Sequence, residues 1–247
     1  MILIPQFFNV SVFFVFLSEV IVAAILFFLT VKLHGRYTER KQAAARYITF
    51  ASLFLALTAC FQLLDLLVMD YYFGIHNLGL SLAYSMSAIA NIFLYLFMLE
   101  IFYTGRKAGG MKLKIFGVVE GTIAILLPIF GPYPTAISAV VSVFDPLLIV
   151  HLVFAIALYV TLFRATTRSI RSTSDQLAMR GFSFIRVASV TIIAAYVFFI
   201  LDEVWTVLYE PAGYTFWVVF GWVAAGITGV LLYLGFVLPT RVRKRNQ

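Results

Sequence analysis

Charged residues are scarce in this sequence, and cysteine and histidine are scarcer. Only 12% of the 247 residues are charged, whereas about 25% is usual for soluble domains. Because Cys60 is the single cysteine, an intrachain disulfide is excluded, and cysteine usage does not indicate the redox compartment. The three histidines do not pair at the spacing of zinc ligands. We therefore expect no metal site and no cofactor.

Sequence elements of several membrane enzymes and pigments are also missing. No lysine lies inside an apolar run, which excludes a retinal Schiff base in the last span. The chain has neither the GxGD element of intramembrane aspartyl proteases nor a GxSG serine motif. Asp202 and Glu203 lack the downstream arginine of the glutamate-type prenyl proteases. We expect that this protein is not an enzyme.

Long apolar runs are what the sequence has instead. Hydrophobic residues make up 63% of the chain. They gather in seven runs, most of them of roughly 17–25 residues, the length that crosses a bilayer as a helix. The runs cover residues 10–31, 47–71, 80–103, 115–130, 136–163, 182–209 and 214–237. The pattern predicts an all-α integral membrane protein with one domain, residues 1–247, that forms a seven-transmembrane helix bundle.

The basic residues predict the orientation of this bundle. All 18 lysines and arginines follow the first, third, fifth or seventh run. Positively charged loops stay on the cytoplasmic side, so we expect the N-terminus outside and the C-terminus in the cytoplasm, as a multi-pass protein of the cell membrane. The net charge of +7 then suits anionic lipids at the cytoplasmic face rather than nucleic acid. A cytoplasmic protein partner and a homo-oligomer both stay open.

The carboxylates are distributed differently from the basic residues. Several of the eleven acids lie inside the apolar runs, where an ionisable group is costly and commonly functional. Without a counter-ion, such a group is neutral or holds a cation. We therefore expect a ligand- or ion-binding site in the middle and outer half of the bundle, formed by Glu19, Gln62, Asp65, Asn91, Asp145, Asp202, Glu203, Trp205 and Trp217. Two acids of the inner halves, Glu100 and Glu120, are candidates for a relay.

Helical periodicity predicts which polar side chains face the interior. In the third run, Tyr84, Ser87, Asn91 and Tyr95 follow one face at about 100° per residue. A polar face of this kind avoids lipid, although its side chains often only hold helices together by hydrogen bonds. His151 is interpreted in the same way, as a packed polar residue.

Small residues at four-residue spacing predict close helix packing in two runs. Gly221, Ala225 and Gly229 share one face of the seventh run, and Gly117 and Gly121 flank Glu120 in the fourth. Such faces allow helix backbones to approach each other.

The segment LLYLGFVLPTRVRKR, from Leu231, resembles the exit of the seven-helix sensor modules of bacterial and archaeal histidine kinases. There a proline and a basic cluster lead into the kinase linker, and ANIFLYLFMLEIF in the third run is similar in character. The sequence contains no dimerisation helix or ATPase domain after this segment. The resemblance implies a sensor-like bundle that acts through a partner, and it assigns no ligand residue.

Two functions follow from these features. The first is a sensor- or receptor-like protein whose acidic and aromatic outer cavity binds a proton, a cation or a small ligand and signals through the basic loops. The alternative is a proton or small-cation transporter or channel that uses the same carboxylates. A continuous polar track to the inner side would favour transport, and a cavity sealed by phenylalanines would favour sensing. A scaffold subunit is the third option.

Overall fold

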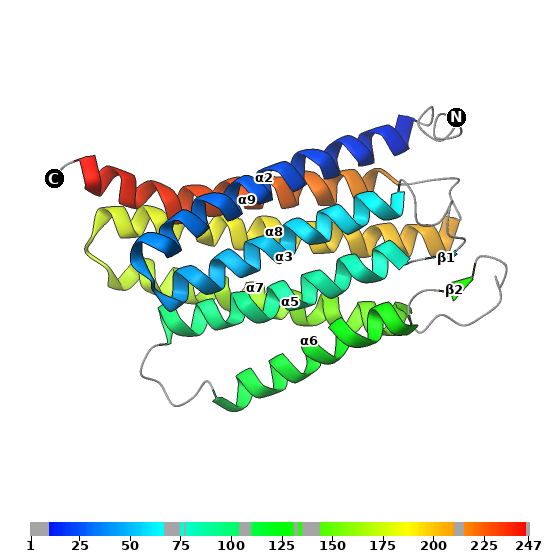
Figure 1. Ribbon diagram of the computed structural model, residues 1–247, viewed down its shortest axis with the longest axis horizontal. Coiled ribbons are helices and arrows are strands. Elements are labelled where there is room, and N and C mark those ends of the chain that lie inside the picture. The colour runs from blue at the N-terminus through cyan, green and yellow to red at the C-terminus, as the bar shows by residue number, and fades with distance from the viewer. Residues whose placement is uncertain are drawn as a thin grey trace.

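The computed structural model describes residues 10–66, 75–76, 78–103, 110–130, 133–134, 144–209 and 215–245. In these ranges the chain is almost entirely helical (Figure 1). The helices are α2 (Val10–Arg40), α3 (Ala43–Leu64), α5 (Leu78–Phe102), α6 (Gly110–Phe130), α7 (Phe144–Ser172), α8 (Gln176–Tyr209) and α9 (Phe216–Arg245). Two short strands, β1 (Ile75–His76) and β2 (Tyr133–Pro134), pair in antiparallel fashion.

Six of the helices form a closed ring. Each packs against its neighbours in the order α2, α3, α5, α7, α8 and α9, and α9 returns to α2. The remaining helix, α6, packs against α5 and α7 at the edge of the bundle (Figure 1). A ring of this kind places one face of every member helix toward a shared interior.

The helices of the ring are also the six that are long and apolar enough to cross a membrane, within the ranges that the structure describes. The protein is therefore a helical protein of multi-pass membrane type. The count of seven spans and the orientation of the termini stay predictions. The outer surface of α6 is nevertheless apolar, since Val118, Ile125 and Ile129 are each at least 60% exposed.

Most helices differ in length from the apolar runs. The helix α9 continues to Arg245, and α6 begins at Gly110, because lysine and arginine are good helix formers that extend a helix past its apolar part. The helix α3 ends at Leu64, and the predicted continuation over 67–71 lies outside the described residues. The predicted start of the fifth span, 136–143, lies outside them as well.

The surface of the bundle is apolar and its interior contains the small and polar residues. Side chains such as Phe28 and Val31 are more than half exposed, whereas Ser81, Ser85 and Asn91 are buried. An apolar surface of this extent has no stable place in water, and lipid is its natural solvent. The described basic residues lie near the C-terminal ends of α2, α7 and α9, or near the starts of α3, α6 and α8.

The two glycine-containing helix faces differ in how closely neighbouring side chains approach them. A Cβ added to Gly221 would lie 2.6 Å from the Phe199 ring, and one added to Gly229 would lie 3.0 Å from Ile25. The predicted close packing of this face of α9 is therefore confirmed. A Cβ at Gly117 or Gly121 would meet nothing within 4 Å in the described part of the chain, so the structure gives these two glycines no packing role there.

Candidate functional site

A long cavity lies inside the helix ring and is lined by all six of its helices. Along α9 its lining extends from Val218 to Phe236, and along α8 from Ala188 to Asp202. At about 1.5 Å rise per residue, these segments are about 27 Å and about 21 Å long. The cavity is therefore comparable in length to the hydrocarbon core of a bilayer, about 30 Å.

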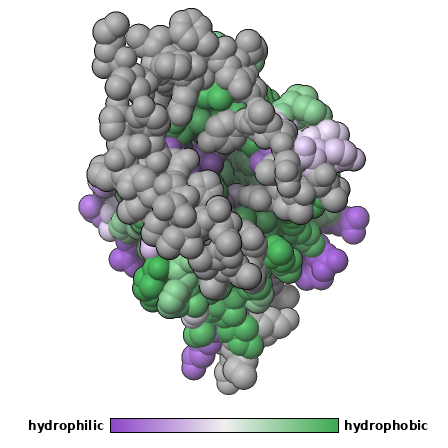
Figure 2. Space-filling view, turned by 90° about the vertical axis from the view of Figure 1, so that its right-hand side faces the viewer, coloured by the Kyte–Doolittle hydropathy of each residue, from purple (hydrophilic) through white to green (hydrophobic). Residues whose placement is uncertain are grey.

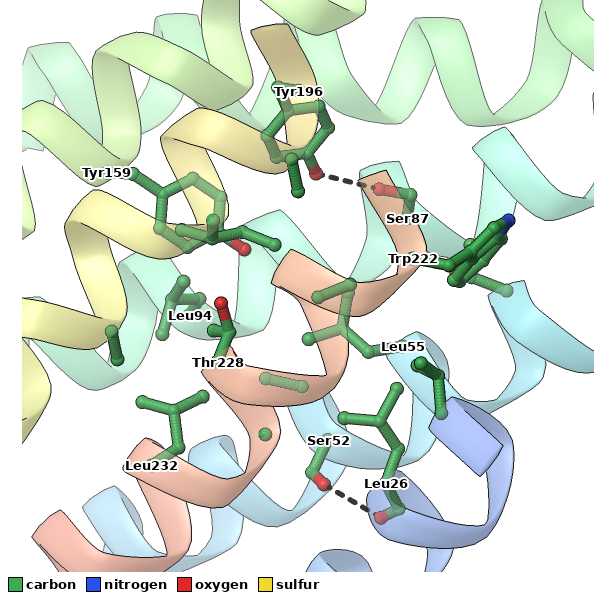
Figure 3. A pocket seen from close by; sticks show the side chains of 18 of the residues that line it. Leu26, Ser52, Leu55, Ser87, Leu94, Tyr159, Tyr196, Trp222, Thr228 and Leu232 are labelled. Atoms are coloured by element: carbon green, nitrogen blue, oxygen red, sulfur yellow. Dashed lines mark hydrogen bonds between the residues drawn. The ribbon is translucent and has the colours of Figure 1, made fainter. Parts of the chain in front are cut away.

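The walls of the cavity are mostly apolar. Figure 3 shows Leu26, Leu55, Leu94 and Leu232 pointing from four helices into the space between them. The end nearest the basic residues is lined by leucine, isoleucine and phenylalanine side chains, namely Leu29, Leu33, Ile48, Leu94, Leu162, Leu232 and Phe236. The opposite end contains Gln62 and Asp202.

The hydroxyl groups in the middle of the cavity wall are engaged by the backbone. The hydroxyl of Ser52 bonds to the Leu26 carbonyl, that of Ser189 to the Ile185 carbonyl and that of Thr228 to the Ala224 carbonyl. The bonds of Ser189 and Thr228 lie within their own helices, as is common for hydroxyls in helices, whereas that of Ser52 joins α3 to α2.

Asp202 connects the end of α8 to the start of α9. Its Oδ1 accepts a hydrogen bond from the Thr215 hydroxyl, and that hydroxyl oxygen accepts one from the backbone N–H of Trp217. Thr215 thus caps the N-terminus of α9 while it binds the carboxyl group. No lysine or arginine forms an ion pair with Asp202 in the described ranges.

Asp65 and Glu19 have different environments, although both belong to the predicted site. Asp65 follows the last residue of α3 and accepts a 2.9 Å hydrogen bond from the Gly79 N–H in the first turn of α5. A carboxylate at a helix N-terminus is stabilised by the free N–H groups there. This bond joins the end of α3 to the start of α5.

Glu19 is 1% exposed in the middle of α2. The indole of Trp222 and the carboxyl of Asp65 are the polar groups near it. Neither Glu19 Oε2 nor Trp222 Nε1 has a hydrogen-bond partner within the described ranges. Trp222 lines the cavity and Glu19 lies behind it.

Four polar side chains from four helices form a chain of contacts in one wall of the cavity. His151 Nδ1 lies 2.9 Å from Glu120 Oε2, and His151 Nε2 lies 3.2 Å from Ser87 Oγ. Ser87 Oγ lies 3.2 Å from the Tyr196 hydroxyl oxygen (Figure 3). All four side chains are buried, and Glu120 and His151 are both 0% exposed. Ser87 and Tyr196 line the cavity, whereas Glu120 and His151 lie behind Ser87.

Two more polar side chains surround this chain of contacts. Tyr159 lies next to Tyr196, with ring centroids 5.8 Å apart, and also lines the cavity. Asn91 lies one helical turn from Ser87 and is fully buried beside Tyr196. Its amide nitrogen and oxygen have no partner among the described residues, which is unusual for a buried amide.

The structure brings together only some of the predicted site residues. Gln62 and Asp202 share the cavity, and Asn91 lies close to its wall. Trp205 and Trp217 form an aromatic group with Tyr209 and Phe216 and do not line the cavity.

The side chains of Asp145 and Glu203 lie outside what the structure describes. The two relay candidates are also separated, because Glu100 is exposed near the end of α5 while Glu120 is buried against His151.

Sequence reasoning missed the contact between Glu120 and His151. The polar face of α5 was a usable signal, since Ser87 and Asn91 are buried as that face predicts. Glu120 and His151 were each visible as a polar residue in an apolar run, but nothing in the sequence places α6 against α7 at their height. Within the described ranges no three histidine, cysteine or acidic side chains converge in a way that could hold a metal ion.

Figure 2 looks onto the end of the bundle that contains the N-terminus of α2, and both hydrophilic and hydrophobic described side chains are visible near its centre. Gln62 and Asp202 belong to the helix segments at this end of the cavity.

No protein-family model matches this chain, and neither a curated protein nor a solved structure matches it.

Proposed function

We propose that this protein is a receptor-like membrane protein that binds an elongated, largely apolar molecule inside its helix ring. One observation carries the proposal: a cavity whose lining extends for about 21–27 Å along α8 and α9, which is formed by all six helices of the ring and has an acid at one end. Ligand sites in proteins are commonly apolar and contain a few polar groups that orient the ligand. This cavity likewise has a long apolar part and a few polar groups at one end.

The lining indicates the chemistry of the ligand. The long apolar part suits a single hydrocarbon chain, because Leu26, Leu94 and Leu232 offer it dispersion contacts and no polar group to desolvate. The end with Gln62 and Asp202 suits an amine or a hydroxyl group, which a carboxyl group binds well. A long-chain amine or alcohol fits both requirements.

A ligand bound in the cavity would change the arrangement of the surrounding helices. A ligand along the cavity touches every helix of the ring, so it favours whichever arrangement of the helices contacts it best. At the basic end, Arg36 Nη1 donates a 2.6 Å hydrogen bond to the carbonyl of Phe236, a residue that lines the cavity. A shift of α9 there would move α2 and the basic segment beside it.

The same lining gives less support to the alternative, proton or cation transport. A pathway needs polar groups along its whole length, and the basic end of the cavity is formed by Leu29, Leu33 and Phe236 among other apolar side chains. The proposal is therefore for binding and signalling.

The test is photo-crosslinking of the purified full chain in lipid nanodiscs with a diazirine derivative of hexadecylamine. We expect saturable crosslinking to cavity residues, competed by unlabelled hexadecylamine. Ala225→Phe, which fills the cavity, should reduce it at least about tenfold, whereas Val223→Phe, on the exposed side of the same helix, should not. Equal crosslinking in both variants, or labels confined to the outer surface, would contradict the proposal.

A further inference from the structure

The contact chain in the cavity wall has the geometry of an activated nucleophile. Ser87 Oγ lies 3.2 Å from one nitrogen of His151, whose other nitrogen lies 2.9 Å from Glu120. In serine hydrolases a base takes the proton of the hydroxyl, and an acid behind the base holds the imidazole in place. Such sites are recognised by geometry and roles, since they recur on unrelated folds in different chain orders.

The position of the cavity agrees with this assignment of roles. Ser87 lines the cavity, and neither His151 nor Glu120 does. A molecule in the cavity would therefore meet the hydroxyl first, with the base and the acid on the far side of it.

The hydrogen bonds can be assigned consistently. With Glu120 as the acceptor, His151 carries its proton on Nδ1, which leaves Nε2 free to accept from the Ser87 hydroxyl. Ser87 Oγ in turn can accept a hydrogen bond from the Tyr196 hydroxyl. This is the tautomer in which His151 can act as a general base toward Ser87.

We propose that Ser87, His151 and Glu120 form an acyl-transfer site that cleaves long-chain carboxylic esters held in the cavity. The inference rests on the proposed function, because it takes the cavity to be the place where an elongated molecule binds. It goes against the expectation from motifs that the protein is not an enzyme, since that expectation relied on local patterns and this site is assembled from three helices.

The reaction uses the ester and water. Ser87 Oγ attacks the ester carbonyl carbon while His151 Nε2 takes the hydroxyl proton. The carbon–oxygen bond to the leaving alcohol then breaks, and His151 returns the proton to that oxygen. A water molecule attacks the acyl-serine with His151 as the base, which releases the carboxylic acid and restores the Ser87 hydroxyl.

The neighbouring side chains would support these steps. Glu120 is a positioning residue that keeps the imidazole oriented. The Tyr196 hydroxyl lies 3.2 Å from Ser87 Oγ, and the buried amide of Asn91 lies beside Tyr196. Both can stabilise the negative charge that develops on the carbonyl oxygen.

The first test is covalent labelling of the purified full chain in nanodiscs by hexadecyl fluorophosphonate, which forms a phosphonyl ester with an activated serine and releases fluoride. We expect mass spectrometry to locate the label on Ser87. Ser87→Ala should abolish labelling, and His151→Gln should slow it at least about 100-fold. Ser189→Ala is the matched control, because Ser189 also lines the cavity but, among the described residues, bonds to the Ile185 carbonyl alone.

The second test separates this inference from the proposed function. Hydrolysis of 4-methylumbelliferyl palmitate should require Ser87, while crosslinking by the hexadecylamine probe should persist in Ser87→Ala. Glu120→Gln should lower the hydrolysis rate and Glu120→Asp should restore part of it. Crosslinking in the cavity without labelling or hydrolysis by the folded wild-type protein would overturn the acyl-transfer site and leave the receptor proposal standing. Labelling that persists in Ser87→Ala would overturn it as well.

Discussion

Two carboxyl groups in this bundle, those of Glu120 and Glu19, are equally buried and differently surrounded. Their exposures are 0% and 1%. Glu120 lies 2.9 Å from an imidazole nitrogen within a chain of polar contacts. Glu19 lies beside the indole of Trp222, and neither its Oε2 nor the Oε1 of Glu120 has a hydrogen-bond partner within the described ranges. Burial alone therefore does not distinguish a site residue from an isolated acid, whereas the neighbouring groups do.

The surroundings of the two acids differ over a wider region as well. Glu120 belongs to the side of the bundle where α5, α7 and α8 meet, and hydroxyl and amide groups gather there. Glu19 lies on α2 next to a cluster of apolar side chains that includes Val15, Ala56 and Val218. The first region contains several side chains in hydrogen-bonding contact with one another, whereas the polar groups near Glu19 are the indole of Trp222 and the carboxyl of Asp65.

The largest effect should follow from removing the partner of Glu120. His151→Ala leaves a fully buried carboxyl group unpaired, which typically costs about 3–5 kcal/mol of stability. We expect a clearly lower midpoint temperature of thermal unfolding, measured in detergent by circular dichroism. The double variant Glu120→Leu/His151→Leu should recover much of the loss, because it removes both polar groups together. A His151→Ala protein as stable as the wild type would show that the pair is not coupled.

A third acid, Asp65, tests whether a hydrogen bond to the backbone contributes as much stability as a contact with a side chain. A Cβ added at Gly79 would lie 2.5 Å from the Asp65 Cβ, so Gly79→Ala pushes the carboxyl group away from the first turn of α5. We expect a loss of about 1–3 kcal/mol in the same unfolding experiment. Gly117→Ala is the control: nothing in the described chain obstructs its Cβ, and the better helix propensity of alanine should make it neutral or stabilising by up to about 1 kcal/mol.

The smallest effect should come from Glu19. Glu19→Gln keeps the shape of the side chain and removes a carboxyl group that has no ion-pair partner in the described ranges. We expect a change in unfolding free energy of less than about 1 kcal/mol, since no buried partner is left unsatisfied. If this variant lost as much stability as His151→Ala, the contrast between the two acids would be wrong.

Part of this arrangement could be predicted from single helices. The apolar runs locate the helices of the ring, and the polar face of the third run correctly places Ser87 and Asn91 in the interior. The basic residues near one end of the bundle were also readable from the chain. Each of these features depends on the sequence of one segment and on the helical repeat.

Other features involve two or more helices and could not be predicted in this way. Asp65, a residue of the predicted site, bonds to the backbone of α5. Trp205 and Trp217, which are predicted to share that site with Asp202, pack against each other and do not line the cavity. In each case the outcome depends on which neighbouring helix the side chain meets.

The sequence by itself determined the class of the protein and which residues avoid lipid, because composition and the helical repeat act within each segment. Only the tertiary structure decided that Glu120 meets His151, that His151 meets Ser87, and that α6 packs outside a ring of six helices. Periodicity specifies the face of a helix on which a residue lies. It does not specify the partner helix or the relative height of the two, and both are set by the packing of the whole bundle.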